Sequence, residues 1–155
     1  MELTTIEILI RLALALALGG LVGVERSLAG KNAGMRTYAL ASMGAALFVI
    51  ISQLASAKLI GTVAFNPIAL APAVISGIGF IGAGLVFHND QKVSGLTSAA
   101  GLWVSAGVGM ACGFGYGLVA LMATLLTLLI FTILWWVERG LKNIAYKRDG
   151  EEGME

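Results

Sequence analysis

Residues 67–86, PIALAPAVISGIGFIGAGLV, are the stretch that most restricts how this chain can fold. These twenty residues carry no charge, and a helix of that length is about 30 Å long, the thickness of a bilayer's hydrocarbon core. Glycines crowd its second half, where they weaken a helix in water but let neighbouring helices approach closely in lipid. The stretch predicts a membrane helix packed tightly at Gly77, Gly79, Gly82 and Gly84.

The same glycines also match the GxGxxG pattern of dinucleotide-binding proteins. That pattern is meaningful only between a strand and an amphipathic helix of a βαβ unit. Both flanks are apolar and read as continuous helix here, so the sequence argues against a nucleotide-binding fold.

The composition of the whole chain indicates a membrane protein. Hydrophobic residues make up 58% of the chain, charged residues 12%, and the mean hydropathy is +0.90. The net charge of +1 forms no basic stripe, so no nucleic-acid partner is expected. Cys112 is the single cysteine, which excludes an intrachain disulfide and argues for a small packing residue.

The predicted fold class is all-α, a polytopic integral membrane bundle of five transmembrane helices. The uncharged run from residue 96 to 137 is too long for one crossing, and the glycines of CGFGYG mark the turn that divides it. A membrane domain is expected over residues 1–142, followed by a short disordered tail over 143–155. The expected helices cover residues 6–24, 37–57, 67–87, 96–112 and 117–137.

Charge distribution predicts how the helices are oriented. Five crossings put the first loop, the third loop and the C-terminus on one side, and these segments hold eight of the ten Lys and Arg residues. The positive-inside rule then places the N-terminus outside and the C-terminus in the cytoplasm.

Two features of the first apolar run concern helix contacts. Gly19 and Gly23 form a GxxxG face, a signal for close helix packing. Glu7 and Arg11 are four residues apart and share a helix face, which favours an interfacial ion pair. The alternative is an intramembrane charge pair in a conduction path.

Polar residues converge at the predicted cytoplasmic ends of the first four helices. They form either a solvated rim that fixes orientation or a ligand or ion pocket above the glycine-rich helices. Trp103 either packs against the glycine face of the third helix or lines a cavity. The hypothetical ligand or ion site comprises Glu25, Arg26, Arg36, Thr37, Asp90, Thr97 and Trp103, with His88 and Lys92 nearby.

Within this cluster, Glu25 is expected to meet Arg36, because the connection between them contains two glycines and can fold back. In the alternative, Glu25 serves a ligand or ion. Glu25 and Asp90 are too few carboxylates to require a Mg²⁺ site, so the metal is left open. No nucleophile stands beside a base, and neither an enzyme nor a cofactor is expected.

Four segments closely resemble the MgtC/SapB family of bacterial inner-membrane proteins. They are RLALALALGGLVGVER (residues 11–26), AGMRTYALASMGAALF (33–48), ISGIGFIGAGLVF (75–87) and VSGLTSAAGLWVSAGVGMACGFG (93–115). The resemblance implies a five-helix, multi-pass protein of the inner membrane. It indicates the short, SapB-like branch without the ACT-like C-terminal domain of MgtC, whose virulence factors carry asparagine where this chain has Thr97.

That resemblance, with the scarcity of buried charge, favours a regulatory or interaction protein linked to magnesium or ion homeostasis and stress adaptation. The alternative is a transporter or channel for a cation or small solute through a glycine-rich polar cavity. The expected partners are the lipid bilayer, a second copy of the chain in a two-fold dimer or higher homo-oligomer, and another membrane complex.

Overall fold

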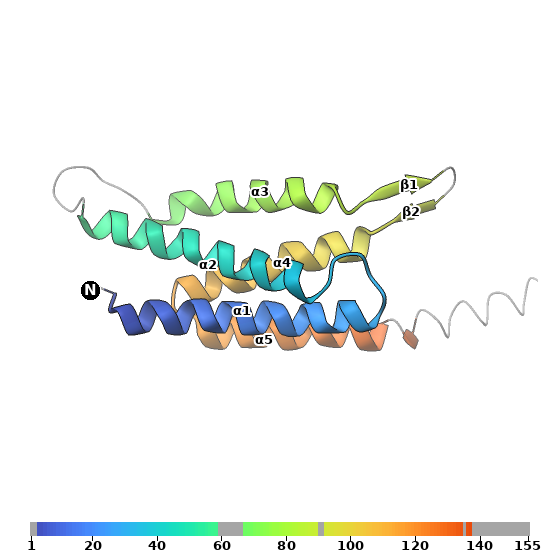
Figure 1. Cartoon of the computed structure of the whole chain (residues 1–155), viewed down its shortest axis with the longest axis horizontal. Helices are drawn as coiled ribbons and strands as arrows, with labels where there is room; N and C mark the ends of the chain where they lie inside the picture. Colours follow the sequence, from blue (N-terminus) through green and yellow to red (C-terminus); the bar gives the residue numbers. More distant parts are fainter. Residues whose placement is uncertain (1–2, 59–66, 90–91, 135, 138–155) are drawn as a thin grey trace, which may run out of the picture.

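A computed structural model describes residues 3–58, 67–89, 92–134 and 136–137. Helices running up and down form nearly all of it, with one short β-hairpin between the third and fourth (Figure 1). The α-helices are α1 (Thr5–Leu28), α2 (Met35–Lys58), α3 (Ala71–Ala83), α4 (Leu96–Gly113) and α5 (Gly117–Leu129). The shorter elements are the 3-10 helix η1 (Pro67–Leu70), strands β1 (Phe87–Asn89) and β2 (Lys92–Ser94), and the π-helical segment η2 (Ile130–Leu134).

The all-helical class and the five helices are confirmed. Four of them, α1, α2, α4 and α5 extended by η2, are long and apolar enough to cross a membrane. The third differs from the prediction, because α3 ends at Ala83 and Phe87 already belongs to β1. Helix η1 and α3 together are about 28 Å long. The predicted tail lies outside the described residues.

Helices α1, α2 and α4 form the centre of the bundle, and glycines set how closely they approach. A Cβ added to Gly19 would stand 2.7 Å from the Tyr38 carbonyl oxygen, and one on Gly23 would stand 2.6 Å from the Met35 Cα atom. On α4, a Cβ on Gly109 would collide with the carbonyl of Ser42. The predicted GxxxG face is therefore used inside the chain, between α1 and α2.

Helix α3 lies on the opposite side of α2 and α4 from α1, whereas α5 runs along α1 (Figure 1). Gly82 of α3 contacts Ala99 of α4, in agreement with its predicted packing role. Gly77 and Gly79 have no neighbouring atom within 4 Å of a built Cβ. No part of this chain therefore packs against Gly77 or Gly79, and their predicted role in helix packing stays a prediction.

The surface of the bundle is apolar along most of its length. Many large hydrophobic side chains are exposed, among them Leu9 on α1, Phe80 on α3 and Leu126 on α5. In water such a continuous surface would drive association, whereas in a bilayer it contacts lipid.

The bundle has two polar ends. The hairpin end carries the α1–α2 connection, the β-hairpin, the start of α4 and η2, and the opposite end, called the amino end here, carries Thr4 and the α4–α5 turn (Figure 1). At the amino end Thr4 and Glu7 form a capping box that starts α1. The expected Glu7–Arg11 ion pair is therefore wrong, since Glu7 accepts its hydrogen bonds from Thr4.

Arg11 instead joins three helices at the amino end. Its Nη1 atom donates to Gln53 Oε1 on α2 over 3.1 Å and to the Gly113 carbonyl of α4 over 2.8 Å. The guanidinium thus supplies donors and positive charge to the carboxyl end of α4, where both are favourable.

Candidate functional site

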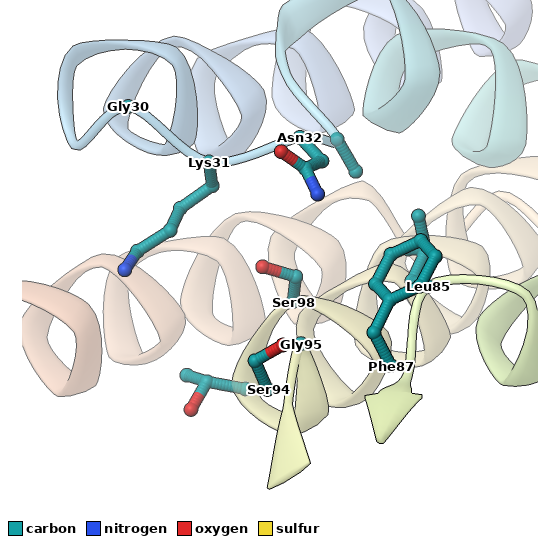
Figure 2. Close-up of a pocket in the computed structure, with 10 residues that line it drawn as sticks. Gly30, Lys31, Asn32, Leu85, Phe87, Ser94, Gly95 and Ser98 are labelled. Carbon is teal, nitrogen blue, oxygen red and sulfur yellow. The ribbon is translucent and has the colours of Figure 1, made fainter. Parts of the chain in front are cut away.

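A small pocket opens at the hairpin end of the bundle. It has a volume of about 190 Å³ and is bounded by three segments: the α1–α2 connection, the chain leaving α3, and the start of α4 (Figure 2). Its lining residues are Gly30, Lys31, Asn32, Ala33, Leu85, Phe87, Ser94, Gly95, Thr97 and Ser98.

The first wall of the pocket follows from the way α1 ends. Gly30 has φ +65°, a left-handed conformation that only glycine adopts without strain. Its N–H donates to the Ser27 carbonyl over 3.1 Å, and the Lys31 N–H donates to the Arg26 carbonyl over 3.0 Å. This pair of bonds is a Schellman motif, which stops the helix and places Lys31 and Asn32 along the pocket.

The second wall is the start of α4. Gly95, the residue before this helix, has φ +89°, and a Cβ there would collide with the Leu85 carbonyl. Glycine is therefore needed both for the turn and for the close approach of β2 to the chain leaving α3. The first hydrogen bond of the helix runs from Ala99 N–H to the Gly95 carbonyl over 2.9 Å.

Tyr38 fixes this part of α4 to α2. The side chain is fully buried, and its hydroxyl donates to the Ser98 carbonyl over 2.8 Å. The Ser105 hydroxyl in turn donates to the Tyr38 carbonyl over 3.0 Å. Gly101 makes room for the phenol, since a Cβ there would lie 2.8 Å from the Tyr38 hydroxyl. The start of α4 is thus held rigidly beside the pocket.

A buried arginine is found at the same end. Arg26 of α1 is only 4% exposed, and its Nε atom donates to the Glu25 carboxylate. Its guanidinium carbon lies 3.6 Å from the centroid of the Phe131 ring, which projects from η2. A cation over an aromatic face contributes about 0.5–2 kcal/mol depending on desolvation. The arrangement joins α1 to the end of α5.

The structure brings together only part of the site predicted from sequence. Glu25 and Arg26 pair with each other, and Thr97 lines the pocket. The expected Glu25–Arg36 pair is wrong: Arg36 is exposed and makes no ion pair within the described part of the chain.

The other predicted residues fall elsewhere. Thr37 is half-buried and lies outside the pocket lining. Trp103 is 53% exposed on the surface of α4 and does not line the pocket. Asp90 is outside the described residues. Among the residues that are described, no group of three or more His, Cys, Asp or Glu side chains is placed to hold a metal ion.

Several residues around the site were missed by sequence reasoning. Gly30 followed by Lys31 and Asn32 carries the signature of a helix C-terminus, and that signal could have identified one wall. The role of Ser98 and the stacking of Phe131 on Arg26 depend on contacts between distant helices, which no local pattern encodes.

Comparisons with known proteins identify the relatives of this chain. The sequence model of the MgtC family matches residues 12–140. "Putative magnesium transporter YhiD" of Escherichia coli K12 is 39% identical over 144 residues, which are 92% of this chain and 67% of that protein. "Protein MgtC" of Salmonella typhimurium LT2 is 36% identical over 93% of this chain and 59% of its own length.

"Protein MgtC" of Brucella abortus 2308 is 42% identical over 123 residues, 79% of this chain and 49% of that protein. The chain thus spans about half to two-thirds of the length of these curated relatives. No solved structure gave a significant match.

Proposed function

This chain belongs to the MgtC family, and we propose that it is a regulatory membrane protein of Mg²⁺ handling that recognises a ligand or another membrane complex at its hairpin end. The link to Mg²⁺ is supported by the name of the E. coli relative and by the match to MgtC proteins. Those relatives are longer than the part matched here, so their activities come to this chain as proposals.

The observation that carries a regulatory role is the closed centre of the bundle. The close approaches at Gly19 and Gly109 leave no space for a hydrated ion between α1, α2 and α4. Gly113 adds a third, because a Cβ there would stand 2.8 Å from the Ala46 carbonyl oxygen. Ser42 lies among these contacts with a fully buried hydroxyl that has no partner in the described residues.

The distribution of charge supports the same proposal. The charged residues of the membrane helices stand near helix ends, as Glu7, Arg11, Glu25 and Arg26 do on α1. A path for a dehydrated divalent cation would need carboxylate or carbonyl oxygens along its length. The middle of the helices offers tightly packed glycine, alanine and serine instead.

A flux measurement tests this proposal. The purified protein would be reconstituted into liposomes that contain a Mg²⁺-sensitive dye, with empty liposomes and ionophore-treated liposomes as controls. We expect Mg²⁺ entry at the rate of empty liposomes. Saturable, protein-dependent entry would contradict the regulatory proposal and establish the alternative, a transporter, which the name of the E. coli relative favours.

We propose further that η1 and α3 together make a fifth crossing in the bacterial inner membrane, with the hairpin end in the cytoplasm. Their combined length of about 28 Å and the positive charge of the hairpin end support this orientation. Cys112 is buried, so added cysteines can be labelled over a low background. An impermeant maleimide applied to spheroplasts should label Tyr116→Cys and spare Lys31→Cys, and the reverse pattern would contradict the orientation.

We also propose that the protein forms a homodimer in which α3 meets a second copy. Support comes from the open positions at Gly77 and Gly79 and from Phe80, which is 84% exposed beside them. Gly79→Leu should then lower the dimer fraction measured by light scattering in mild detergent, whereas Gly44→Leu, at an equally open position on α2, should not. A monomer at all concentrations would refute the dimer.

A further inference from the structure

We propose that the pocket at the hairpin end is a binding site for a phosphate-type oxyanion, held by Lys31, by the Ser98 hydroxyl and by the first N–H groups of α4. The inference names a ligand class for the regulatory role proposed above and rests on that role only for its biological meaning. Figure 2 shows the Asn32 amide pointing from the α1–α2 connection towards Ser98 at the start of α4, while the long Lys31 side chain borders the pocket on one side.

The start of α4 offers unused donors. Gly95 provides no side-chain cap, and the N–H groups of residues 96–98 donate no hydrogen bond within the described part of the chain. Helix α4 has 18 residues, so its amino end carries the equivalent of about half a positive charge. Donors and positive potential together are what an anion requires at a helix start.

Ser98 is the independent observation that points to a ligand. The residue is 93% buried, since only 7% of its surface is exposed, yet its side chain lines the pocket. Its carbonyl accepts from Tyr38, but its hydroxyl donates none of the side-chain hydrogen bonds found among the described residues of this region. Thr124 and Thr127 of α5, by contrast, donate to carbonyls one turn earlier. A hydroxyl that lacks this local bond and lies at the wall of a pocket can bond a group that enters the pocket.

The charges around the pocket select an anion over a cation. Lys31 is the one charged residue among the described residues of the lining, and no carboxylate belongs to them. Asn32, Ser94 and Thr97 are neutral and able to donate hydrogen bonds. Mg²⁺ is usually bound through one or two carboxylates together with water. The described lining supplies a lysine and no carboxylate, so it fits an anion better than a cation.

Size and position narrow the ligand further. The volume of about 190 Å³ is below the roughly 300–1,000 Å³ that is usual for pockets of drug-sized ligands, so a single phosphate-sized group fits better than a nucleotide. Phe87 and Leu85 form an apolar edge beside the polar donors. That chemistry accommodates either inorganic phosphate or the headgroup phosphate of an anionic lipid.

The test is binding to the purified chain in detergent, in two arms. In the first, inorganic phosphate is titrated by calorimetry, with chloride at equal ionic strength as the control. In the second, phosphatidic acid and neutral phosphatidylcholine are compared by native mass spectrometry. The variants are Lys31→Gln and Ser98→Ala, and Arg36→Gln is the matched charge control, because Arg36 is exposed and outside the pocket lining.

We expect saturable binding in at least one arm, weakened about tenfold or more by Lys31→Gln and about threefold to tenfold by Ser98→Ala. Arg36→Gln should bind like the wild type. Binding of inorganic phosphate identifies a free oxyanion as ligand, whereas binding of phosphatidic acid alone identifies a lipid headgroup. Size-exclusion profiles of the variants check that they fold.

Absence of binding in both arms would overturn the inference, and so would equal losses in Lys31→Gln and Arg36→Gln, which would indicate surface attraction only. These outcomes are separate from the liposome experiment. Mg²⁺ flux would contradict the regulatory role while leaving anion binding in place, and a lack of binding would leave the regulatory role without this ligand.

Discussion

The two ends of α4 are completed in different ways. At its carboxyl end the Gly113 carbonyl accepts a hydrogen bond from Arg11, which also reaches Gln53 and so joins three helices. At the N-terminus of α4 Gly95 offers no side-chain cap, and Gly95, Thr97 and Ser98 line a pocket that Lys31 also borders. A carbonyl at the C-terminus of α4 thus has a side-chain partner within the protein, whereas the N-terminus of α4 has no side-chain cap.

The difference shows where structure and function divide in this bundle. A helix end in or near a membrane must find partners for its free backbone groups, and an arginine brought from another helix does this permanently. The N-terminus of α4 lacks such a partner, although Tyr38 and Gly95 hold it in place. Its backbone N–H groups are therefore ordered and can bind a ligand. We therefore propose that the N-terminus of α4 serves recognition, whereas its C-terminus, bonded by Arg11, is structural.

Replacing Arg26 with glutamine should have the largest effect on stability, because it disrupts the support beneath the hairpin end. The change leaves the Glu25 carboxylate without its partner and removes the cation from the Phe131 ring. We expect a loss of roughly 3 kcal/mol, at the lower end of values for a broken buried pair, because Glu25 is partly exposed. Thermal unfolding in detergent measures it, and Arg36→Gln, an exposed position, is the control. Equal, small effects of the two variants would show that Arg26 is not structural.

The second variant, Arg11→Gln, disrupts the contacts that Arg11 makes at the amino end of the bundle. It removes two charge-assisted hydrogen bonds and leaves the Gly113 carbonyl without its donor, at a cost of about 2 kcal/mol. The double variant with Gln53→Leu should lose less than the sum of the two single losses, since the bond between the side chains is already broken. Full additivity would contradict a direct Arg11–Gln53 interaction. Anion binding at the hairpin end should stay unchanged.

The third test sharpens the comparison with two glycines in left-handed conformations, one at each end. Gly30→Ala should cost about 1 kcal/mol from backbone strain alone, because no atom lies within 4 Å of the new methyl group. Gly115→Ala should cost more, because its methyl group would also stand 3.0 Å from Arg11 Nη2. Chemical unfolding in mixed micelles can rank them. A larger loss of stability in Gly30→Ala than in Gly115→Ala would contradict the closer packing around Gly115 at the amino end of the bundle.

Much of this fold can be predicted from sequence, for definite reasons. Hydrophobic length and the loop charges define the helices from residue 6 to residue 137, and the GxxxG face at Gly19 and Gly23 correctly indicates close contact. The start of α1 was readable too, since Thr4 and Glu7 have the spacing of a capping box. Three-residue strands such as β1 and β2 are too short to leave a reliable pattern.

The site was less predictable because its chemistry depends on which helix faces which. Arg36 and Glu25 are close enough in sequence to pair, yet the carboxylate of Glu25 pairs with Arg26 instead. The Arg26 side chain is held near that carboxylate because it stacks on the Phe131 ring. From its place within a helix, Trp103 was expected either to pack against the glycine face of the third helix or to line a cavity, but 53% of it is exposed on the surface of α4. Such rotational positions are set by packing of the whole bundle and not by local sequence.

Hydrogen exchange of α4 is the most direct test of the contrast between its two ends. Exchange would be followed by mass spectrometry with and without inorganic phosphate, or with phosphatidic acid if only the lipid binds. The account predicts that peptides covering residues 92–99 become protected when the ligand is added, while peptides covering residues 112–117, where Arg11 already caps the helix, do not change. Unchanged exchange at residues 92–99, or equal protection at both ends of α4, would contradict the claim that the N-terminus of α4 is open for an anion.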